Sequence, residues 1–244
     1  MYNVVVTGAS RGIGLAVARE LAREGYRVLA VARRETAELR AAADDLPTRA
    51  SGEIHFFSFD LEQLDEIADL VRSLREVHGP IYGLVNNAGM SVEGVLAQMR
   101  EKVIERVIRL NVLAPILVAK QAVRSMMASG QGRIINMASI VATTGFSGLS
   151  VYAATKASMV GFTHSLAREV GALGITVNAV APGFIETDLT AGSHPRQLEA
   201  VARRSALKRL ANKDDVAHAV SFLMSEKARN ITGVVLTVDA GGTA

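Results

Sequence analysis

The sequence predicts an α/β domain in which one parallel sheet of about seven strands is covered by helices on both faces. Short runs that are apolar throughout alternate with longer stretches of helical periodicity, a pattern typical of a doubly wound sheet. The chain has 244 residues, of which 49% are hydrophobic and 21% charged, and no linker or repeat divides it. We therefore expect a single domain over residues 1–244, large enough to bury a core without disulfides.

The predicted strands are short and rich in valine and isoleucine. They are expected at 3–7, 27–32, 54–59, 81–85, 133–138, 175–181 and 234–238. The predicted helices cover 13–24, about 35–46, the stretch around 64–74, 99–129 with an early break, 151–171 and about 214–224. Residues about 184–209 show no clear pattern and are rich in Thr, Gly, Ser and Pro at their start, which predicts a mobile lid over a substrate site.

Composition excludes several classes of site. Cysteine is absent, which excludes disulfides, cysteine-ligated zinc, iron–sulfur clusters and a cysteine nucleophile, and no metal site is predicted. The net charge is +3 and the charges are interspersed, so a mixed solvated surface is favoured over a nucleic-acid patch. The apolar stretch 110–119 contains Asn111 and Pro115 and is too short to cross a bilayer. Since a predicted strand begins almost at once, we expect no signal peptide, no membrane association and a cytoplasmic location.

Glycines gather between the first predicted strand and the first helix, in the run Thr7-Gly8-Ala9-Ser10-Arg11-Gly12-Ile13-Gly14. They allow a tight turn and a close approach of the backbone, so that a pyrophosphate can lie on the helix N-terminus. The spacing is G-x-x-x-G-x-G rather than the commoner G-x-G-x-x-G. The turn predicts a Rossmann-type dinucleotide site that includes Gly8, Ser10, Arg11, Gly12, Ile13 and Gly14.

The same turn has a second interpretation. Residues 8–12 match G-x-S-x-G, the nucleophile elbow of α/β-hydrolases, which also lies between a strand and a helix. In a hydrolase sheet that elbow normally follows several earlier strands, whereas here the first strand of the chain leads into it. Of the histidines, only His194 lies in an obvious loop near the expected site. The dinucleotide interpretation is therefore favoured.

The end of the second strand indicates which dinucleotide is bound. An NAD site usually places an acidic residue there to hold the ribose 2′-hydroxyl. This chain has Arg33 and Arg34 instead, and Glu35 comes only afterwards. Arg11 adds a third cation within the glycine turn. Guanidinium groups pair with phosphate in a bidentate manner, so the three arginines favour NADP(H) over NAD(H) and over a role as plain surface charges.

Tyr152 and Lys156 lie one turn apart on a predicted helix and so share a face. A nearby ammonium group and an oxidised nicotinamide ring would lower the pKa of a tyrosine and let it exchange a proton with a carbonyl oxygen. Ser139 follows the fifth strand, at the edge where open α/β sheets bind ligands, and its hydroxyl could bind the same oxygen. Alone, a Tyr-x-x-x-Lys pair is more often structural than catalytic.

Taken together, these motifs resemble the short-chain dehydrogenase/reductase family in order and spacing over essentially the whole chain. The resemblance is carried by 7–14, Asn86-Asn87-Ala88-Gly89, Asn111, Ser139, Tyr152-Ala-Ala-Thr-Lys156 and Pro182-Gly183. It implies a catalytic tetrad of Asn111, Ser139, Tyr152 and Lys156, with Asn111 holding a water in the proton relay. It also implies that Asp60 and Leu61 flank the adenine, that Asn87, Ala88, Gly89, Pro182 and Gly183 line the cofactor with Tyr152 and Lys156, and that Ile185 and Thr187 meet the nicotinamide amide.

Within that family, the segments 132–134, 166–170, 180–190, 231–233 and 238–242 are similar to those of 3-oxoacyl-[acyl-carrier-protein] reductases. The resemblance implies NADPH-dependent reduction of a 3-oxoacyl thioester to the 3-hydroxyacyl form. These reductases often carry arginines for docking an acidic carrier protein near two places where this chain has Gly130 and Leu173, so the carrier partner is left open. Alternatives are reduction of another small ketone or sugar, and a non-catalytic dinucleotide-sensing protein of the same fold.

The family resemblance further implies a homotetramer, with two long helices, about 101–129 and 151–171, forming one interface and the C-terminal strand another. The first of these helices is apolar around much of its surface, which indicates burial on more than one side. One side would meet the sheet and the other a second subunit. The alternative is that the lid segment covers the second side within one chain.

Overall fold

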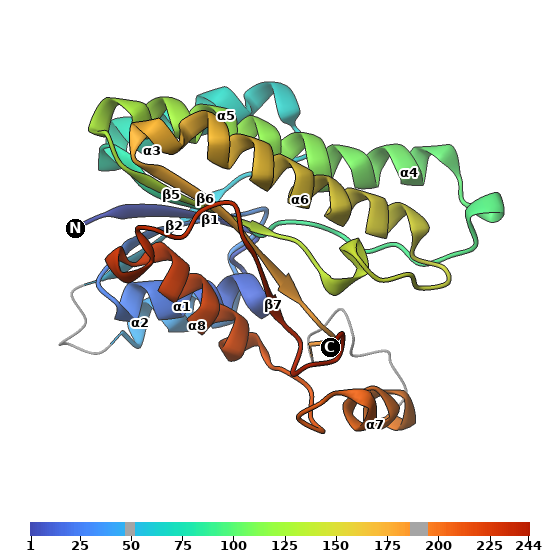
Figure 1. Ribbon diagram of the computed structural model, residues 1–244. Helices are drawn as coiled ribbons and strands as arrows, with labels where there is room; N and C mark the ends of the chain where they lie inside the picture. Colours follow the sequence, from blue (N-terminus) through green and yellow to red (C-terminus); the bar gives the residue numbers. More distant parts are fainter. Residues whose placement is uncertain (47–51, 186–194) are drawn as a thin grey trace.

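A parallel sheet runs through the middle of the protein, with helices above and below it (Figure 1). The computed structural model describes residues 1–46, 52–185 and 195–244. Within these residues the sheet has seven strands in the order β3-β2-β1-β4-β5-β6-β7, and every neighbouring pair is parallel. The predicted doubly wound α/β fold is confirmed. The order reverses between β1 and β4, which is where Rossmann-type sheets bind their ligands.

The strands form where the sequence predicts them. They are β1 (Asn3–Thr7), β2 (Arg27–Ala32), β3 (Glu53–Ser58), β4 (Ile81–Asn86), β5 (Gly132–Met137), β6 (Ile175–Pro182) and β7 (Val235–Val238). Every residue of β1, β4, β5 and β6 is buried, because both faces of the sheet are covered. Successive side chains of β1 enter opposite cores: Val4 and Val6 pack into one, and Val5 into the other.

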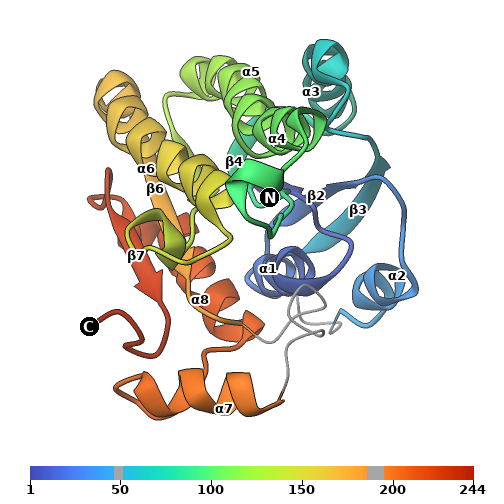
Figure 2. The ribbon, with the colours of Figure 1, turned by 90° about the vertical axis from the view of Figure 1, so that its right-hand side faces the viewer.

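Two layers of helices cover the sheet, as the two views show (Figure 2). One layer holds α1 (Gly12–Arg23), α2 (Ala37–Asp44) and α8 (Lys213–Met224). The other holds α3 (Ile67–His78), α4 (Glu101–Ile108), α5 (Ala114–Ser129) and α6 (Ser150–Val170). Helix α8 begins with a complete capping box, in which Asn212 and Asp215 each bond to the other's backbone N–H. No helix of the described residues is both long and apolar enough to cross a membrane.

The long helix predicted at 99–129 is interrupted, as expected. A π-helical turn, Arg109–Leu113, separates α4 from α5. Such turns widen the helix by one residue and are frequent at functional sites. Asn111, one of the predicted site residues, lies inside this turn and is 2% exposed.

Helix α7 (Pro195–Arg204) was not predicted. Leu198, Val201 and Ala202 do have helical spacing, but the helix has only 10 residues and follows a stretch rich in Thr, Gly and Ser. It projects from the body of the protein beside the C-terminus (Figure 1). The proposed lid extends over residues that include 186–194, which lie outside the described part of the chain, as do the predicted Thr187 and the loop residue His194.

Candidate active site

The glycine turn leaves β1 at the carboxyl edge of the sheet and leads into α1. Gly8 and Gly12 have φ angles of +67° and +58°, which glycine adopts at little cost. A side chain on Gly14 would collide with the Gly8 carbonyl oxygen, so Gly14 lets the helix approach the turn closely. At Gly12, by contrast, no atom lies within 4 Å of the position that a Cβ would take. The turn is therefore packed on its inner side and open at Gly12, as a phosphate-binding turn requires.

The end of β4 is bonded to the glycine turn. The Asn87 side-chain amide donates to the carbonyl oxygens of Thr7 and Gly8, at 2.9 and 3.2 Å. The backbone N–H groups of Asn87 and Ala88 both donate to Thr7 Oγ1, each at 3.0 Å. The two loops on either side of the point of strand reversal thus form one rigid unit. Asn87, Ala88 and the glycine turn are brought together as the sequence predicted.

Three cations face solvent around this unit. Arg11, Arg33 and Arg34 are exposed, and in the described part of the chain their side chains make no hydrogen bond or ion pair. Arg11 precedes α1, whose N-terminus has no side-chain cap and no acidic residue in its first turn. The Glu35 carboxylate accepts a hydrogen bond from Arg40 Nη2 at 2.5 Å. An anion at this end of the sheet would therefore meet free helix N–H groups and guanidinium groups, with the Glu35 carboxylate already paired.

The loop after β3 is tied to helix α4. The backbone N–H of Glu62 donates to the Asp60 carboxylate at 3.0 Å, while Leu61 is 6% exposed and packs in the core. The Glu62 carboxylate accepts from Arg106 on α4, whose Nε and Nη2 lie 2.7–3.0 Å from its oxygens. The Arg106 guanidinium lowers the pKa of the Glu62 carboxyl, with a smaller contribution from Arg33. This pairing joins segments 44 residues apart, and sequence reasoning did not find it.

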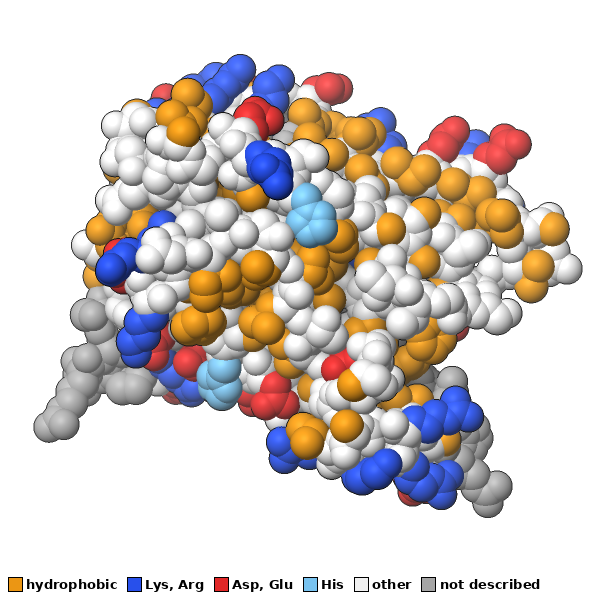
Figure 3. Space-filling model, viewed as in Figure 1, with side chains coloured by type: hydrophobic (Ala, Val, Ile, Leu, Met, Phe, Trp, Pro, Cys, Tyr) orange, Lys and Arg blue, Asp and Glu red, His pale blue; other side chains and the backbone are white. Residues whose placement is uncertain are grey.

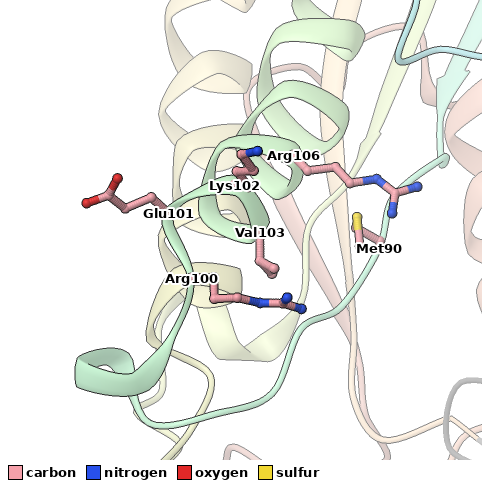
Figure 4. Close-up of a pocket in the computed structure, with 6 residues that line it drawn as sticks. All are labelled: Met90, Arg100, Glu101, Lys102, Val103 and Arg106. Atoms are coloured by element: carbon pink, nitrogen blue, oxygen red, sulfur yellow. The ribbon is translucent and has the colours of Figure 1, made fainter.

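Beside this bridge lies a hollow of about 570 Å³, lined by Met90, Arg100, Glu101, Lys102, Val103 and Arg106. Figure 4 shows the side chains of Arg100 and Arg106 extending toward the side on which Met90 lies, while Glu101 points away. Met90 directly follows Gly89, so the hollow adjoins the loop that is predicted to line the cofactor. The hollow is open to solvent, and three of its six lining residues are the cations Arg100, Lys102 and Arg106. None of its residues was predicted from the sequence.

The predicted catalytic side chains converge at the carboxyl end of β5. Ser139 follows that strand, and its hydroxyl lies near that of Tyr152 on α6, where it lowers the pKa of the Tyr152 hydroxyl. Lys156, one turn further on, is 7% exposed; its ammonium lies 5.7 Å from the centre of the Tyr152 ring and donates to the Met137 carbonyl at 2.8 Å. Tyr152 and Lys156 thus share a face of α6 that is turned into the protein against the end of β5.

Asn111 is held on the opposite side of the same site. Its amide oxygen accepts from Met90 N–H at 2.9 Å, and its amide nitrogen donates to the Met90 carbonyl at 2.8 Å and to Thr155 Oγ1 at 3.2 Å. A Cβ on Gly89 would come within 3.1 Å of the Asn111 oxygen and 3.8 Å of Lys156 Nζ. Asn111, Gly89 and Lys156 are therefore neighbours. Both amide donors of Asn111 are occupied, so a water at this residue would contact one lone pair of its oxygen or its main-chain carbonyl.

Comparison with known proteins agrees with this arrangement. Residues 2–198 match the family model of the short chain dehydrogenases. The chain belongs to the short-chain dehydrogenase family. It is 39% identical to the 3-oxoacyl-[acyl-carrier-protein] reductase FabG of Vibrio cholerae, over 97% of this chain and 95% of that protein.

Two solved structures are similar over nearly the full length. A short-chain type dehydrogenase/reductase from Mycobacterium ulcerans has a TM-score of 0.92 and 32% identity, covering 99% of this chain and 89% of that one. A protein of Beutenbergia cavernae, described as an NAD(P)-dependent gluconate 5-dehydrogenase and containing NADP at low occupancy, has the same TM-score and identity and covers 99% and 96%. The chain is therefore an oxidoreductase of this family, whose members use a nicotinamide dinucleotide.

The pKa values at the site of this short-chain dehydrogenase show what the protein contributes by itself. Burial raises the pKa of the Tyr152 hydroxyl above its usual value, and Ser139 opposes this rise only in part. Burial also lowers the pKa of the Lys156 ammonium to about 8. The sequence predicts that Lys156 and an oxidised nicotinamide ring together lower the pKa of Tyr152, and that remains a prediction for the protein with its cofactor.

Thr155 is a residue of the site that sequence reasoning missed. It is 2% exposed, donates to the Tyr152 carbonyl at 2.7 Å and accepts from the Asn111 amide. It therefore links the π-helical turn to the helix that carries Tyr152. Its place inside the Tyr-x-x-x-Lys motif, one turn from Tyr152 and next to Lys156, was the available signal.

The remaining predicted cofactor residues lie at the end of β6. Gly183 N–H donates to the Val238 carbonyl at 2.9 Å, and a Cβ on Gly183 would lie only 2.5 Å from the Asp239 Cβ. Ile185 is 4% exposed and forms a parallel bridge with Ala211. Pro182 and Gly183 thus end beside Ser139's strand, at the same edge of the sheet. Groups of His, Asp and Glu that could hold a metal ion are absent from the described part of the chain.

Proposed function

We propose that this short-chain dehydrogenase uses NADPH to reduce the carbonyl of a 3-oxoacyl thioester to a secondary alcohol. The observation that carries the proposal is the half-buried Tyr152, whose hydroxyl lies near Ser139 and whose ring centre lies 5.7 Å from the Lys156 ammonium. Because burial raises its pKa, Tyr152 is protonated at neutral pH. A protonated phenol is the form needed to donate a proton to a carbonyl oxygen.

Bound NADPH would supply the hydride that is added to the carbonyl carbon. Ser139 and Tyr152 hydrogen-bond the carbonyl oxygen and polarise it, and as negative charge develops there, the Tyr152 proton is transferred to it. The resulting phenolate is stabilised by the Ser139 hydroxyl and by the Lys156 ammonium. Lys156 is fixed by its bond to the Met137 carbonyl, and Asn111 holds the loop at Met90 against it. The tyrosine is then reprotonated from the side of Lys156 and Asn111.

The preference for NADPH rests on charge. The open glycine turn, the uncapped N-terminus of α1 and the exposed Arg11, Arg33 and Arg34 all fit a group with several phosphates. Near the end of β2 the Glu35 carboxylate is engaged by Arg40 and would not compete for a ribose hydroxyl. The solved relative with NADP at low occupancy is consistent with this preference. In the same proposal, Asp60, Leu61 and Ile185 line the cofactor.

The substrate class rests on the relatives. Several bacterial proteins named as 3-oxoacyl-[acyl-carrier-protein] reductases are 36–39% identical over nearly the whole chain. A second candidate is oxidoreduction of a sugar acid, which is favoured by the solved relative described as a gluconate 5-dehydrogenase at 32% identity. The proposal does not name an acyl carrier protein as the partner, because Gly130 and Leu173 stand where docking arginines are common.

A steady-state assay of NADPH and NADH oxidation would test the proposal. The panel would hold 3-oxoacyl thioesters on coenzyme A and on acyl carrier protein, simple ketones and 5-ketogluconate. We expect the highest kcat/KM with a 3-oxoacyl thioester and NADPH. A higher value with 5-ketogluconate would support the second candidate, and no turnover of any carbonyl compound would contradict a reductase.

We also propose that the protein acts as a cytoplasmic homotetramer. Several large apolar side chains remain open to solvent: Ile108, Leu113 and Met127 along the α4–α5 helices, and Phe222, Val234 and Leu236 on α8 and around β7. Figure 3 shows hydrophobic side chains along α4 and over β7 and α8. Within the described residues, strand β7 ends the sheet and pairs with β6 alone. Burial of both surfaces against further copies would remove these apolar groups from water.

A further inference from the structure

The loop 140–149 joins Ser139 to helix α6, which carries Tyr152. It begins with the 3-10 turn Ile140–Ala142, and both of its ends are therefore fixed at the candidate site. Two hydrogen bonds close its return into α6: Leu149 N–H donates to the Phe146 carbonyl at 3.2 Å, and Ala153 N–H donates to the Leu149 carbonyl at 2.7 Å. The same turn that places Tyr152 thus places Phe146.

The Phe146 ring packs against a second aromatic ring across the carboxyl edge of the sheet. Its centre lies 5.8 Å from that of Phe184, and the two planes meet at 65°. Phe184 follows Pro182 and Gly183 at the end of β6, the strand that pairs with β5 next to Ser139. Although it is packed on one side, Phe146 is 39% exposed. A ring fixed in this way offers its open side to an apolar ligand.

A second loop extends this apolar surface. Gly94 N–H donates to the Gly148 carbonyl at 2.9 Å, which joins the loop after β4 to the loop that carries Phe146. The next residues, Val95 and Leu96, are 62% and 55% exposed. Hydrophobic side chains cover the right-hand tip of the molecule, where this segment projects (Figure 3). We name Val95, Leu96, Phe146 and Phe184 the apolar rim. Apolar side chains that gather on joined loops mark a binding surface more often than single ones do.

We infer that the apolar rim binds the alkyl chain of the substrate beyond the reacting carbonyl, and that Phe146 is a specificity-determining residue for chain length. The position of the rim indicates the alkyl chain as its ligand. The loop that carries Phe146 joins Ser139 to the helix of Tyr152, and these two residues are proposed to bind the carbonyl oxygen. None of the four side chains can hydrogen-bond a hydroxyl group, so the rim selects against sugar acids. The inference deepens the proposed function and rests on it.

The test is the dependence of kcat/KM on chain length. NADPH-dependent reduction would be measured for 3-oxoacyl thioesters from four to ten carbons, in the parent and in Phe146→Ala, Phe146→Leu and Val77→Ala. Val77 lies on α3, is exposed at 69% and serves as the control, because it belongs neither to the rim nor to the proposed subunit interfaces. Each methylene that leaves water is worth about fourfold. We expect kcat/KM to rise at least tenfold along the series in the parent and in Val77→Ala, to stay nearly flat in Phe146→Ala, and to rise in Phe146→Leu, which keeps an apolar side chain.

Two results would overturn the inference. One is an equal rise in the parent and in Phe146→Ala. The other is a loss of thermal stability in Phe146→Ala with the chain-length dependence unchanged, which would mean that the rim is covered within the protein or by a second copy. If no thioester is reduced but simple ketones are, the proposed function fails, and the same comparison on a series of 2-alkanones decides the role of Phe146 independently.

Discussion

Replacement of Lys156 by methionine tests whether burial lowers the pKa of this ammonium group and thereby destabilises the fold at neutral pH. The folded protein holds the pKa of Lys156 at about 8, against an ordinary value of 10.5 in the unfolded chain, because burial disfavours the charged form. The folded state therefore binds fewer protons than the unfolded state between pH 8 and pH 10.5. In that window the free energy of unfolding rises with pH, and below it the protein bears the full cost of the buried charge.

The size of the effect follows from the shift. At about 1.4 kcal/mol per pKa unit, Lys156 destabilises the fold by on the order of 3 kcal/mol at pH 7, and most of this cost is relieved by pH 10. Methionine has a similar length and no charge. It also leaves the Met137 carbonyl without its partner, which costs about 1–3 kcal/mol at every pH. Only the titration of Lys156 changes with pH, so the difference between parent and variant isolates it.

The assay is urea unfolding of the parent and of Lys156→Met from pH 6.5 to pH 9.5, at one protein concentration, because subunit association would make stability depend on concentration. We expect the parent to gain stability relative to the variant as the pH rises through 8. The exposed Lys227, changed to methionine, is the control, and its difference from the parent should stay constant. A constant difference for Lys156→Met as well would mean that Lys156 keeps its ordinary pKa in the folded protein and would refute the argument.

Four further outcomes are expected. Tyr152→Phe should bind NADPH normally and lose about 10²–10⁴-fold in turnover; more than a tenth of parental activity would exclude Tyr152 as the acid. Arg33→Asp should weaken NADPH binding at least tenfold, since a charge-assisted hydrogen bond is worth about 1.5–3 kcal/mol; equal binding of NADPH and NADH by the parent would contradict this reasoning. Thr155→Val should lower kcat more than the KM for NADPH, because it unpairs the Asn111 amide, and Thr155→Ser should restore kcat; a change in Tm alone would make Thr155 merely structural. Sedimentation at micromolar concentration should show four associated chains; a single species of 25.9 kDa would refute the tetramer.

The sheet was predictable because it depends on local patterns. Val4, Val5 and Val6 form a run that is apolar on both faces, and only a strand covered on both sides buries all three. The glycine turn was predictable for a similar reason, since its conformation at Gly8 and Gly12 depends on those residues themselves. Helix α7 was not predicted, because it is short and follows residues rich in Thr, Gly and Ser, which favour an irregular segment, even though Leu198, Val201 and Ala202 have helical spacing.

Contacts between distant segments were the part of the site that local patterns could not give. The bridge between Glu62 and Arg106 joins the loop after β3 to helix α4, whose approach depends on how α4 packs, and neither residue belongs to a motif. The same holds for the electrostatics of Tyr152. The spacing from Tyr152 to Lys156 predicted their proximity correctly, but the depth at which both are buried determines the sign of the pKa shift, and that depth is a property of the whole fold.

The π-helical turn Arg109–Leu113 is a local feature that creates contacts between distant segments. A regular helix through Arg109–Leu113 would follow one continuous hydrogen-bond pattern, whereas the extra residue in the turn changes the direction of the side chains that follow it. Here the turn contains Asn111, whose side-chain amide hydrogen-bonds with the backbone N–H and carbonyl of Met90 and with Thr155 on α6. The loop that begins with Asn87 is thereby fixed at one end to the glycine turn and at the other to the helix of Tyr152 and Lys156. The dinucleotide-binding half of the site and its proton-donating half are therefore joined through a chain of three side chains, Asn87, Asn111 and Thr155.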